Sequence, residues 1–366
     1  MSTTTTTRTA LSTAKPQTFT IEPTPVWTPL PLEGHIPSPY TTPSGLNVVP
    51  LHPSFGCELS GVDWAKPIPE ALYREIRDVV DKYGVVACRK TDLTDEAHIA
   101  FSSFFGDLDD VRPYIDAGRK HRLAYPELFD AGNIDPNTGD VAPLSAAQVV
   151  GNKANELFHV DSSFNARRAG HSMLLAHIIP PAGVSRIHRY PLYTADSQAG
   201  MGGATEFADS RTAYEDLPTE KKTQLEGLVA NHSLFHSRKT AVPEYFKDTD
   251  PMKLPLSKHK LVQKHEWTGR KNLYIASYVH HIDGMDPSES TALIRELIAH
   301  VSKPKYRLTV NGDMIIWDNT AVLHRATGGS YEGKFKRDMR RTTVKDMSSS
   351  KFGLNGEGAD WRVGLP

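Results

Sequence analysis

Two distant segments of the chain carry side chains that must come together to act on one ion, and this requirement restricts the fold. His159 and Asp161 are separated by one residue, and His324 lies far along the sequence. On a β-strand, residues i and i+2 point to the same side, so the spacing predicts a strand with His159 and Asp161 on one face. His324 must then arrive from a distant strand. Two imidazoles and one carboxylate can cover one face of a divalent metal and leave the other face open, which is typical of non-haem Fe(II) oxygenases.

A basic segment, residues 336–344, follows the last of these histidines. Its alternating pattern and its β-branched end predict a strand. Arg337 and Arg341 then share one face, and Arg340 shares the opposite face with Asp338. Two guanidinium groups in one cleft are strong ligands for carboxylates, because each offers a rigid bidentate fork. An open metal beside such groups indicates a cosubstrate that is both a chelator and an acid, and 2-oxoglutarate fits this description.

The remaining core is expected to combine many strands with a few helices. Strands are predicted at residues 46–51, 57–62, 85–88, 173–179, 306–310, 313–317 and 341–345. Helices are predicted at residues 70–83, 95–104, 219–228 and 290–300. The helix over 70–83 is amphipathic and is followed by Gly84, a residue suited to a left-handed C-cap. Thr94 is expected to cap the start of the helix over 95–104.

Taken together, several motifs resemble those of the taurine and 2,4-dichlorophenoxyacetate dioxygenases, which depend on Fe(II) and 2-oxoglutarate. The motifs occupy residues 149–152, 158–164, 202–207 (Gly-Gly-Ala-Thr-Glu-Phe), 209–214, 269–271 and 317–343, which begins Trp-Asp-Asn. The resemblance extends from about Leu46 to Asp346 and is closer to the dichlorophenoxyacetate branch. It implies a mainly β fold with flanking helices, namely the double-stranded β-helix, a jelly-roll variant of the clavaminate synthase type.

The resemblance also implies roles for individual residues. His159, Asp161 and His324 match the iron ligands. Thr205 and Arg337 match the residues that hold 2-oxoglutarate.

Two further matches concern the primary substrate. Arg341 matches an arginine that lies near the cosubstrate and also meets the anionic group of the primary substrate. Asn155 matches an asparagine on the substrate side, although a turn residue that leads into the strand is an equally good interpretation.

The implied activity is hydroxylation of a small organic anion, such as an aryloxyacetate-like carboxylate, with 2-oxoglutarate and O2 consumed and succinate and CO2 released. A sulfonate or taurine-type substrate is the first alternative. A Zn-dependent hydrolase is another, since the same three ligands can hold zinc, but it gives the two arginines no role. An inactive binding protein on the same fold is the last alternative.

Composition restricts the possible partners and the compartment. Lys plus Arg is 42 and Asp plus Glu is 43, which gives no electrostatic case for nucleic acid or a membrane surface. No apolar run is long enough to span a bilayer. Cys57 and Cys88 form neither a metal motif nor a disulfide framework, so a reducing, cytoplasmic compartment is expected. A homo-oligomer remains open.

Residues 44–347 are predicted to form a single dioxygenase domain. Residues 1–43 are rich in Thr and Pro and are expected to be a disordered tail, and residues 348–366 an irregular C-terminal tail. Residues 184–198 form an atypical insert between the metal and cosubstrate motifs. We interpret it as a retained intron, because its ends can be coded GTGAGT and CAG in frame; a lid loop is the alternative.

Other basic side chains are expected to be structural. The histidines that could act as further ligands are His232, His236, His265, His280, His281 and His300. We prefer structural roles for them, because only a few of the 16 histidines can line one site. The basic run over 112–122 is expected to be a solvated loop rather than part of a substrate entrance.

Overall fold

The computed structural model describes residues 35–180, 203–310, 313–329 and 331–364. The insert predicted at residues 184–198 lies outside the described residues, as does the chain before residue 35. The helices are α1 (Glu70–Tyr83), α2 (Asp95–Ser103), α3 (Arg112–Asp116), α4 (Ala147–Asn152), α5 (Ser210–Glu215), α6 (Thr219–Leu225), α7 (Leu234–Ala241) and α8 (Pro287–Val301). Three 3-10 turns are η1 (Lys153–Glu156), η2 (Pro251–Lys253) and η3 (Pro304–Tyr306).

The largest sheet has eight strands in the order β1-β2-β3-β4-β14-β6-β16-β5. These strands are β1 (Tyr40–Thr41), β2 (Asn47–Pro50), β3 (Cys57–Ser60), β4 (Val85–Cys88), β14 (Met314–Asp318), β6 (Ala169–Ile178), β16 (Asp338–Lys345) and β5 (Phe129–Asp130). Among the described strand pairs, β3 and β4 run parallel and the others run antiparallel. Because β1 pairs with β2, ordered structure begins before the domain boundary predicted at residue 44.

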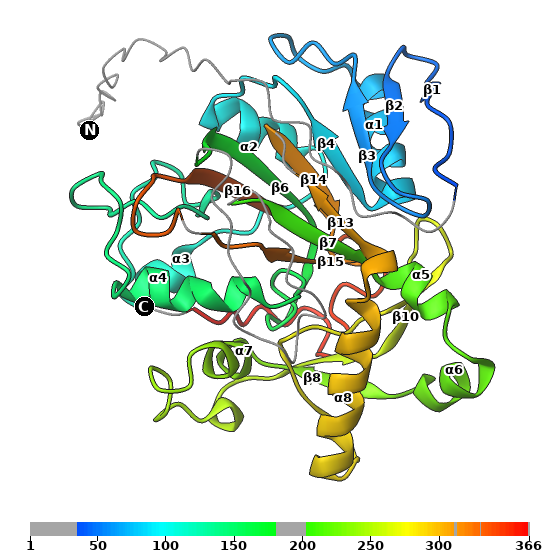
Figure 1. Cartoon of the computed structure of the whole chain (residues 1–366), viewed down its shortest axis with the longest axis vertical. Coiled ribbons are helices and arrows are strands. Elements are labelled where there is room, and N and C mark those ends of the chain that lie inside the picture. The colour runs from blue at the N-terminus through cyan, green and yellow to red at the C-terminus, as the bar shows by residue number, and fades with distance from the viewer. Residues whose placement is uncertain (1–34, 181–202, 311–312, 330, 365–366) are drawn as a thin grey trace, which may run out of the picture.

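A second sheet packs against the inner face of the first. Its order is β13 (Arg307–Val310), β7 (Thr205–Asp209), β15 (Val322–Ala326). Leu174 and Trp317 from the large sheet and Phe207 from the small one belong to the same buried apolar cluster. This is the two-sheet arrangement of a jelly roll, and β7 and β15 cross the inner face in Figure 1.

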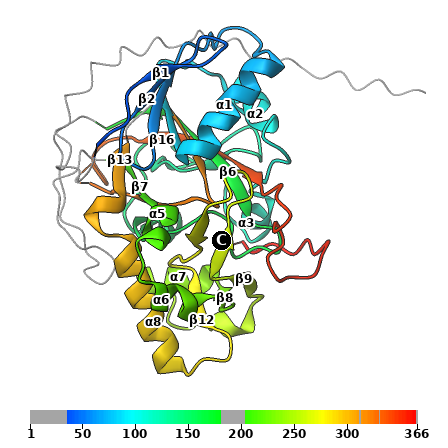
Figure 2. The ribbon, with the colours of Figure 1, turned by 90° about the vertical axis from the view of Figure 1, so that its right-hand side faces the viewer.

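The outer face of the large sheet is covered by α1 and α2, which lie at the top of the molecule in Figure 2. The predicted bounds of α1 agree with the structure, and its apolar side buries Ile76 and Val80 against the sheet. Gly84 ends α1 with φ +72° and donates its N–H to Val80. Thr94 caps α2 by accepting a hydrogen bond from the N–H of Ala97, as predicted.

A third region contains a separate apolar core. It is built on the sheet β12 (Val279–Ile282), β8 (Val229–His232), β9 (Ser257–Lys260), with the pair β10 (Val262–Lys264) and β11 (Lys271–Leu273) beside it. The helix α8 runs along this region in Figures 1 and 2. Its Leu297 is buried in the core. Val160, between the two predicted ligands His159 and Asp161, packs into the same core. This region therefore holds in place the segment that carries both ligands.

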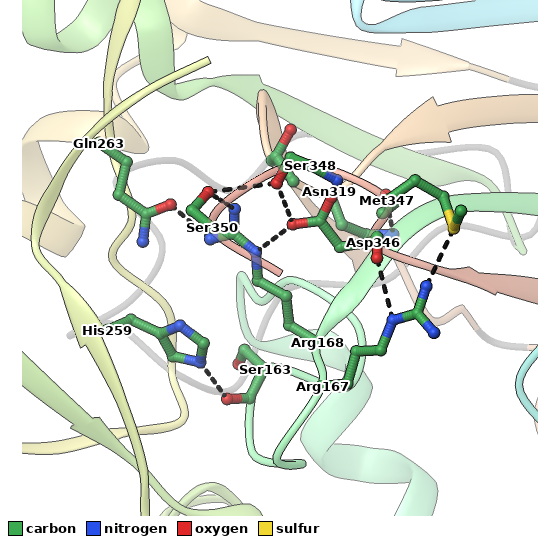
Figure 3. Close-up of polar contacts among 12 residues, drawn as sticks. Ser163, Arg167, Arg168, His259, Gln263, Asn319, Asp346, Met347, Ser348 and Ser350 are labelled. Atoms are coloured by element: carbon green, nitrogen blue, oxygen red, sulfur yellow. Dashed lines mark hydrogen bonds and ion pairs between the residues drawn. The ribbon is translucent and has the colours of Figure 1, made fainter. Parts of the chain in front are cut away.

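The C-terminal segment after β16 has no helix or strand among the described residues, but it is attached to the rest of the structure by several contacts. Buried Arg168 pairs with Asp346 at 2.7 Å and also contacts Ser350 and Gln263 (Figure 3). Further along the chain, the N–H of Leu354 donates a hydrogen bond to the carbonyl of Lys258 in β9 at 2.8 Å. The segment therefore ties the large sheet to the third region. No helix among the described residues is long and apolar enough to cross a membrane.

Candidate metal centre

His159 and His324 face each other across an isolated antiparallel bridge. Each backbone N–H donates to the carbonyl of the other residue, at 3.0 and 2.8 Å. The bridge brings the two imidazole centroids to 4.2 Å. His324 belongs to β15, as a distant strand was expected to supply it, and Trp317 packs beside its ring at 4.8 Å. The two-sheet packing thus joins segments that lie far apart in sequence.

Asp161 completes the group, but not in the way that the spacing predicted. The expected strand is absent: His159 makes only the single bridge, and Asp161 begins a turn. Other elements hold the carboxylate instead. The Asp161 N–H donates to Asn319 at 2.9 Å, and the Ser172 hydroxyl donates to Asp161 Oδ2 at 2.7 Å. Asp161 Oδ2 lies 3.7 Å from His324 Nε2, so the carboxylate reaches the imidazoles from a turn.

The protonation states of the group suit metal binding. Burial lowers the pKa of His159 to about 4, and burial together with His159 holds the pKa of His324 well below its ordinary value. Burial by itself would raise the pKa of Asp161, but Arg341, followed by His324 and His159, brings it below the ordinary value. At neutral pH the three side chains are therefore two neutral imidazoles and one carboxylate.

The donor set fits Fe(II). The ligand atoms of His159, Asp161 and His324 lie within 4.8 Å of one another, and all three side chains are buried. The Leu157 carbonyl lies 2.7 Å from His159 Nδ1, which directs the Nε2 lone pair away from the backbone. Two nitrogen ligands and one carboxylate match the ligand set of non-haem iron centres.

Arg337 lies close to this group and has no carboxylate partner among the described residues. Its Nε and Nη2 donate to the carbonyl of Gly203 at 3.3 and 3.2 Å, and its Nη1 donates to the carbonyl of Ala131. Arg337 and Asn155 line one hollow beside α4 and η1. Carbonyl oxygens orient a guanidinium without supplying a counter-charge, so Arg337 can pair with an anion.

Thr205 begins β7 and pairs with Ala326 of β15, next to the turn at Gly203 that contacts Arg337. It is buried, with 5% of its surface exposed. Asn155 lies in η1 rather than in a turn that leads into a strand, and its Oδ1 accepts a hydrogen bond from Arg238 at 3.2 Å. Both residues are therefore near the metal group, on different elements.

Within β16 the faces of Arg340 and Arg341 agree with the alternation in the sequence, but Arg337 precedes the strand, and the pairing with β6 is irregular between Asp338 and Met339. Arg340 pairs with Asp338 at 3.0 Å and with Asp95 of α2 at 2.5 Å, so it lies on the outer face. Arg341 lies on the inner face, where its Nη1 donates to Asp161 Oδ1 at 2.5 Å. However, Arg341 and Arg337 do not line one cleft: Arg341 lines a second hollow, with Tyr114 and Phe129.

Other candidate ligands lie elsewhere. His265 contacts Asp318 at 2.7 Å, and His232 contacts Ser163 at 2.9 Å. Among the described residues, a second group with metal-ligand spacing is Asp81, His171 and Asp318. Asp318 also accepts hydrogen bonds from Thr320, so we assign this group to a polar network that holds α1 against β6 and β14.

The basic run over 112–122 is partly buried and is not the solvated loop that we predicted. Arg122 pairs with Asp130 at 2.8 Å and with Asp338 at 2.5 Å. The Arg119 guanidinium stacks on Phe129 at 5.5 Å. These two arginines therefore stabilise β5 and β16 close to the hollow that Arg341 lines.

Sequence reasoning missed Asn319, Ser172 and Arg238. Asn319 lies in the Trp-Asp-Asn motif, so its position was available as a signal, but its contact with Asp161 spans 158 residues. Ser172 lies in an apolar strand, and Arg238 in a helix that the sequence did not predict. Nothing in their local spacing points to the metal group.

Comparisons with known proteins place the chain in a family. The model of the "Taurine catabolism dioxygenase TauD, TfdA family" matches residues 47–343. The chain is 34% identical over 300 residues to an alpha-ketoglutarate-dependent 2,4-dichlorophenoxyacetate dioxygenase of Cupriavidus pinatubonensis, covering 81% of this chain and 96% of that enzyme. It is 28% identical to an (S)-phenoxypropionate/alpha-ketoglutarate-dioxygenase of Sphingobium herbicidovorans, covering 77% and 89%.

Solved structures agree with this result. The crystal structure of AAD-2 in complex with Mn(II) and N-oxalylglycine superimposes with a TM-score of 0.72 at 31% identity, covering 83% of this chain and 98% of that chain. The likeness confirms the predicted mainly β, double-stranded β-helix fold. The family match extends over most of the chain and includes the segments that meet at the metal group. The chain therefore belongs to the TauD/TfdA family of dioxygenases.

Proposed function

We propose that this enzyme hydroxylates a small organic anion and that His159, Asp161 and His324 hold its Fe(II). Family membership establishes the dioxygenase class, and the relatives depend on 2-oxoglutarate, so Fe(II) and 2-oxoglutarate are the cofactor and the cosubstrate. The observation that carries the assignment of residues is the buried group of two neutral imidazoles and one carboxylate, with Arg337, a cation that has no carboxylate partner among the described residues, nearby.

The two ends of 2-oxoglutarate would be held by different parts of the site. When bound together, Fe(II) and 2-oxoglutarate supply the oxygen activation that oxidises a substrate C–H bond, with release of succinate and CO2. Arg337 receives the far carboxylate, and Thr205, at the start of β7 and two residues after the Gly203 that contacts Arg337, donates a hydrogen bond to it. N-oxalylglycine in the related AAD-2 structure carries the same pair of groups, a chelating end and a distant carboxylate.

The hydrogen bonds around the ligands orient them. Ser172 and Asn319 fix Asp161, and the Leu157 carbonyl accepts the Nδ1 proton of His159, which keeps the ring in one tautomer and one orientation. Apolar neighbours such as Trp317 keep water away from His324. The protein thus limits side reactions in which the oxidant attacks solvent or the protein itself.

The substrate class that we propose is an aryloxyacetate-like carboxylate. The relatives named above act on 2,4-dichlorophenoxyacetate and on (S)-phenoxypropionate. Arg341, on the inner face of β16, would meet the substrate anion as well as the cosubstrate. Asn155 lies on the substrate side of the site. Hydroxylation of the carbon beside the ether oxygen would then cleave the ether.

A sulfonate or sulfate ester is the second candidate class. The chain is 29% identical to an alkylsulfatase of Acinetobacter baylyi, covering 82% of this chain and 86% of that enzyme. A guanidinium binds a sulfonate as readily as a carboxylate. The Zn-dependent hydrolase and the inactive binding protein lose support, because the family and the relatives are dioxygenases.

The decisive experiment is an anaerobic titration of the purified protein with Fe(II) and 2-oxoglutarate, followed by a screen for succinate release. We expect a weak visible charge-transfer band on chelation, and succinate release that increases with phenoxyacetate or with an alkyl sulfonate. Zinc in place of iron should support neither result. Absence of the band from protein that retains Fe(II) would overturn the proposed site.

The remaining expectations complete the proposal. Residues 44–347 act as one dioxygenase domain, and O2 is consumed because the enzyme is a dioxygenase. The cytoplasm is supported by two buried cysteines that form no disulfide, Cys57 and Cys88. The near balance of 42 basic and 43 acidic residues supports small-molecule partners rather than nucleic acid. Sequencing the transcript tests whether residues 184–198 are a retained intron.

A further inference from the structure

Arg238 is a buried cation that the proposed function does not yet use. It lies on α7, and 6% of its surface is exposed. No carboxylate among the described residues lies within ion-pairing distance of it. Its Nη1 donates to Asn155 Oδ1 at 3.2 Å, while its buried Nε has no hydrogen-bond acceptor among the described residues. Burial of a guanidinium without a counter-charge lowers the stability of the fold, and a bound anion would remove this cost. Such a residue therefore indicates an anion-binding site.

The neighbours of Arg238 place it beside the metal group. Asn155 precedes His159 by four residues and belongs to η1, against which α7 packs. Tyr278 packs edge-on against the His159 ring, with centroids 5.7 Å apart. Burial raises the pKa of Tyr278, and the positive charge of Arg238 is the main influence that opposes it. The charge of Arg238, which contacts Asn155, therefore acts on both the tyrosine and the His159 imidazole.

The large sheet contributes a second guanidinium, Arg341 of β16, next to the metal group. Arg341 bonds to Asp161 through Nη1 and stacks over Phe129 at 4.5 Å, and its buried Nε also lacks a partner among the described residues. Burial raises the pKa of Tyr114, and the charges of Arg238, Arg119 and Arg341 all oppose this shift. The cations of α7 and β16 thus both act on Tyr114, which lines one hollow with Arg341. Asp109 acts on Tyr114 in the opposite sense, and Asp161 already pairs with Arg341, so three guanidiniums face two carboxylates here.

We propose that Arg238 binds the anionic group of the primary substrate, opposite Arg341, and that Asn155 orients the Arg238 fork. This inference rests on the proposed function and deepens it, because it assigns a residue of α7 to substrate recognition. A carboxylate between two guanidiniums on opposite elements is fixed in both position and orientation. The carbon next to the carboxylate would then lie over the metal group, where hydroxylation is required.

Arg238 has a different role from Arg337. Arg337 lies with Gly203 and Ala131 at the far end of the first hollow, where the distant carboxylate of 2-oxoglutarate is expected. Arg238 reaches the site through Asn155, on the side of His159. Loss of Arg238 should therefore weaken the binding of the primary substrate and leave the binding of 2-oxoglutarate unchanged. A purely structural role would instead lower stability and affect both ligands together.

The test compares Arg238→Met and Arg238→Lys with the neighbouring control Lys239→Met. Lys239 lies on the same helix and donates to backbone carbonyls of Lys247 and Thr249, so its loss removes one charge without touching the site. Each protein is loaded with Mn(II) and 2-oxoglutarate without oxygen. Calorimetry then measures the binding of phenoxyacetate, hexyl sulfonate and the neutral analogue phenoxyacetamide. Succinate release with Fe(II) supplies KM and kcat.

We expect Arg238→Met to weaken the binding of the better anionic probe by roughly 30-fold or more, as for loss of a charge-assisted contact. Binding of phenoxyacetamide and of 2-oxoglutarate should change less than about threefold, and Arg238→Lys should be intermediate because it keeps the charge without the fork. Asn155→Ala should raise KM for the anion with little change in kcat. Lys239→Met should match the wild type.

The inference is overturned if Arg238→Met binds the anion as tightly as the wild type does. It is also overturned if the variant loses 2-oxoglutarate and the anion equally, because this would indicate a structural role. If the wild type binds 2-oxoglutarate but neither anionic probe, the anion site is refuted while the proposed metal site stands. If the wild type binds neither the metal nor 2-oxoglutarate, the proposed function itself fails.

Discussion

Replacement of Arg337 by Met tests the cosubstrate assignment most directly, and the expected magnitude follows from its contacts. A guanidinium has five N–H donors. Three of them donate to the carbonyls of Gly203 and Ala131, which leaves one N–H on Nη1 and one on Nη2. These two form a fork that suits a single carboxylate. Loss of such a charge-assisted contact costs about 2–5 kcal/mol, or roughly 30-fold to a few thousandfold in the dissociation constant of 2-oxoglutarate.

The assay is calorimetric binding of 2-oxoglutarate to Mn(II)-loaded protein, together with the dependence of succinate release on 2-oxoglutarate. Arg340→Met is the matched control, since it removes the same charge from the opposite face of the segment, beside Asp338 and Asp95. Thermal unfolding of both variants separates binding from stability. If Arg340→Met loses affinity for 2-oxoglutarate while Arg337→Met behaves as the wild type does, the assigned faces and the cosubstrate role are wrong.

Three further predictions address the metal, pH and the C-terminal segment. Asp161→Ala should abolish succinate release and bound metal after desalting, with a nearly unchanged fold; iron-dependent turnover at the wild-type rate would rule the ligand out. Burial lowers the pKa of His98 to about 4, so the unfolded chain takes up a proton first as pH falls below about 6.5. The contribution of His98 to the free energy of unfolding should therefore be fully present above about pH 6.5. It should fall by about 2 kcal/mol between pH 7 and pH 5. Urea unfolding of His98→Gln should show a correspondingly smaller loss, and an identical loss would refute the reasoning. Arg168→Met leaves Asp346 buried and unpaired and should cost about 3–5 kcal/mol in thermal unfolding, whereas the exposed Arg74→Ala should cost less than about 0.5 kcal/mol; equal losses would contradict the role of Arg168.

The sequence by itself determined the features that depend on local pattern. The amphipathic period and Gly84 specify α1 and its end, because a helix repeats its faces every 3.6 residues. Alternation along β16 specifies that Arg340 points away from Arg341, because a strand repeats every two residues. The order of the His-x-Asp motif, the distant histidine and the arginines indicated the metal and the cosubstrate, and together with the other motifs it identified the family.

Only the tertiary structure decided how Asp161 reaches the metal group. The i, i+2 spacing is compatible with a strand, but contacts from β6 and from the residue after β14 stabilise a turn. Ser172 of β6 holds the Asp161 carboxylate, and Asn319 holds its backbone. Such contacts join residues that are distant in sequence, and no local period records them. The packing of α7 against η1 likewise decided that Arg238 contacts Asn155, four residues before His159. The local sequence around an arginine does not show which distant residues it will meet after folding.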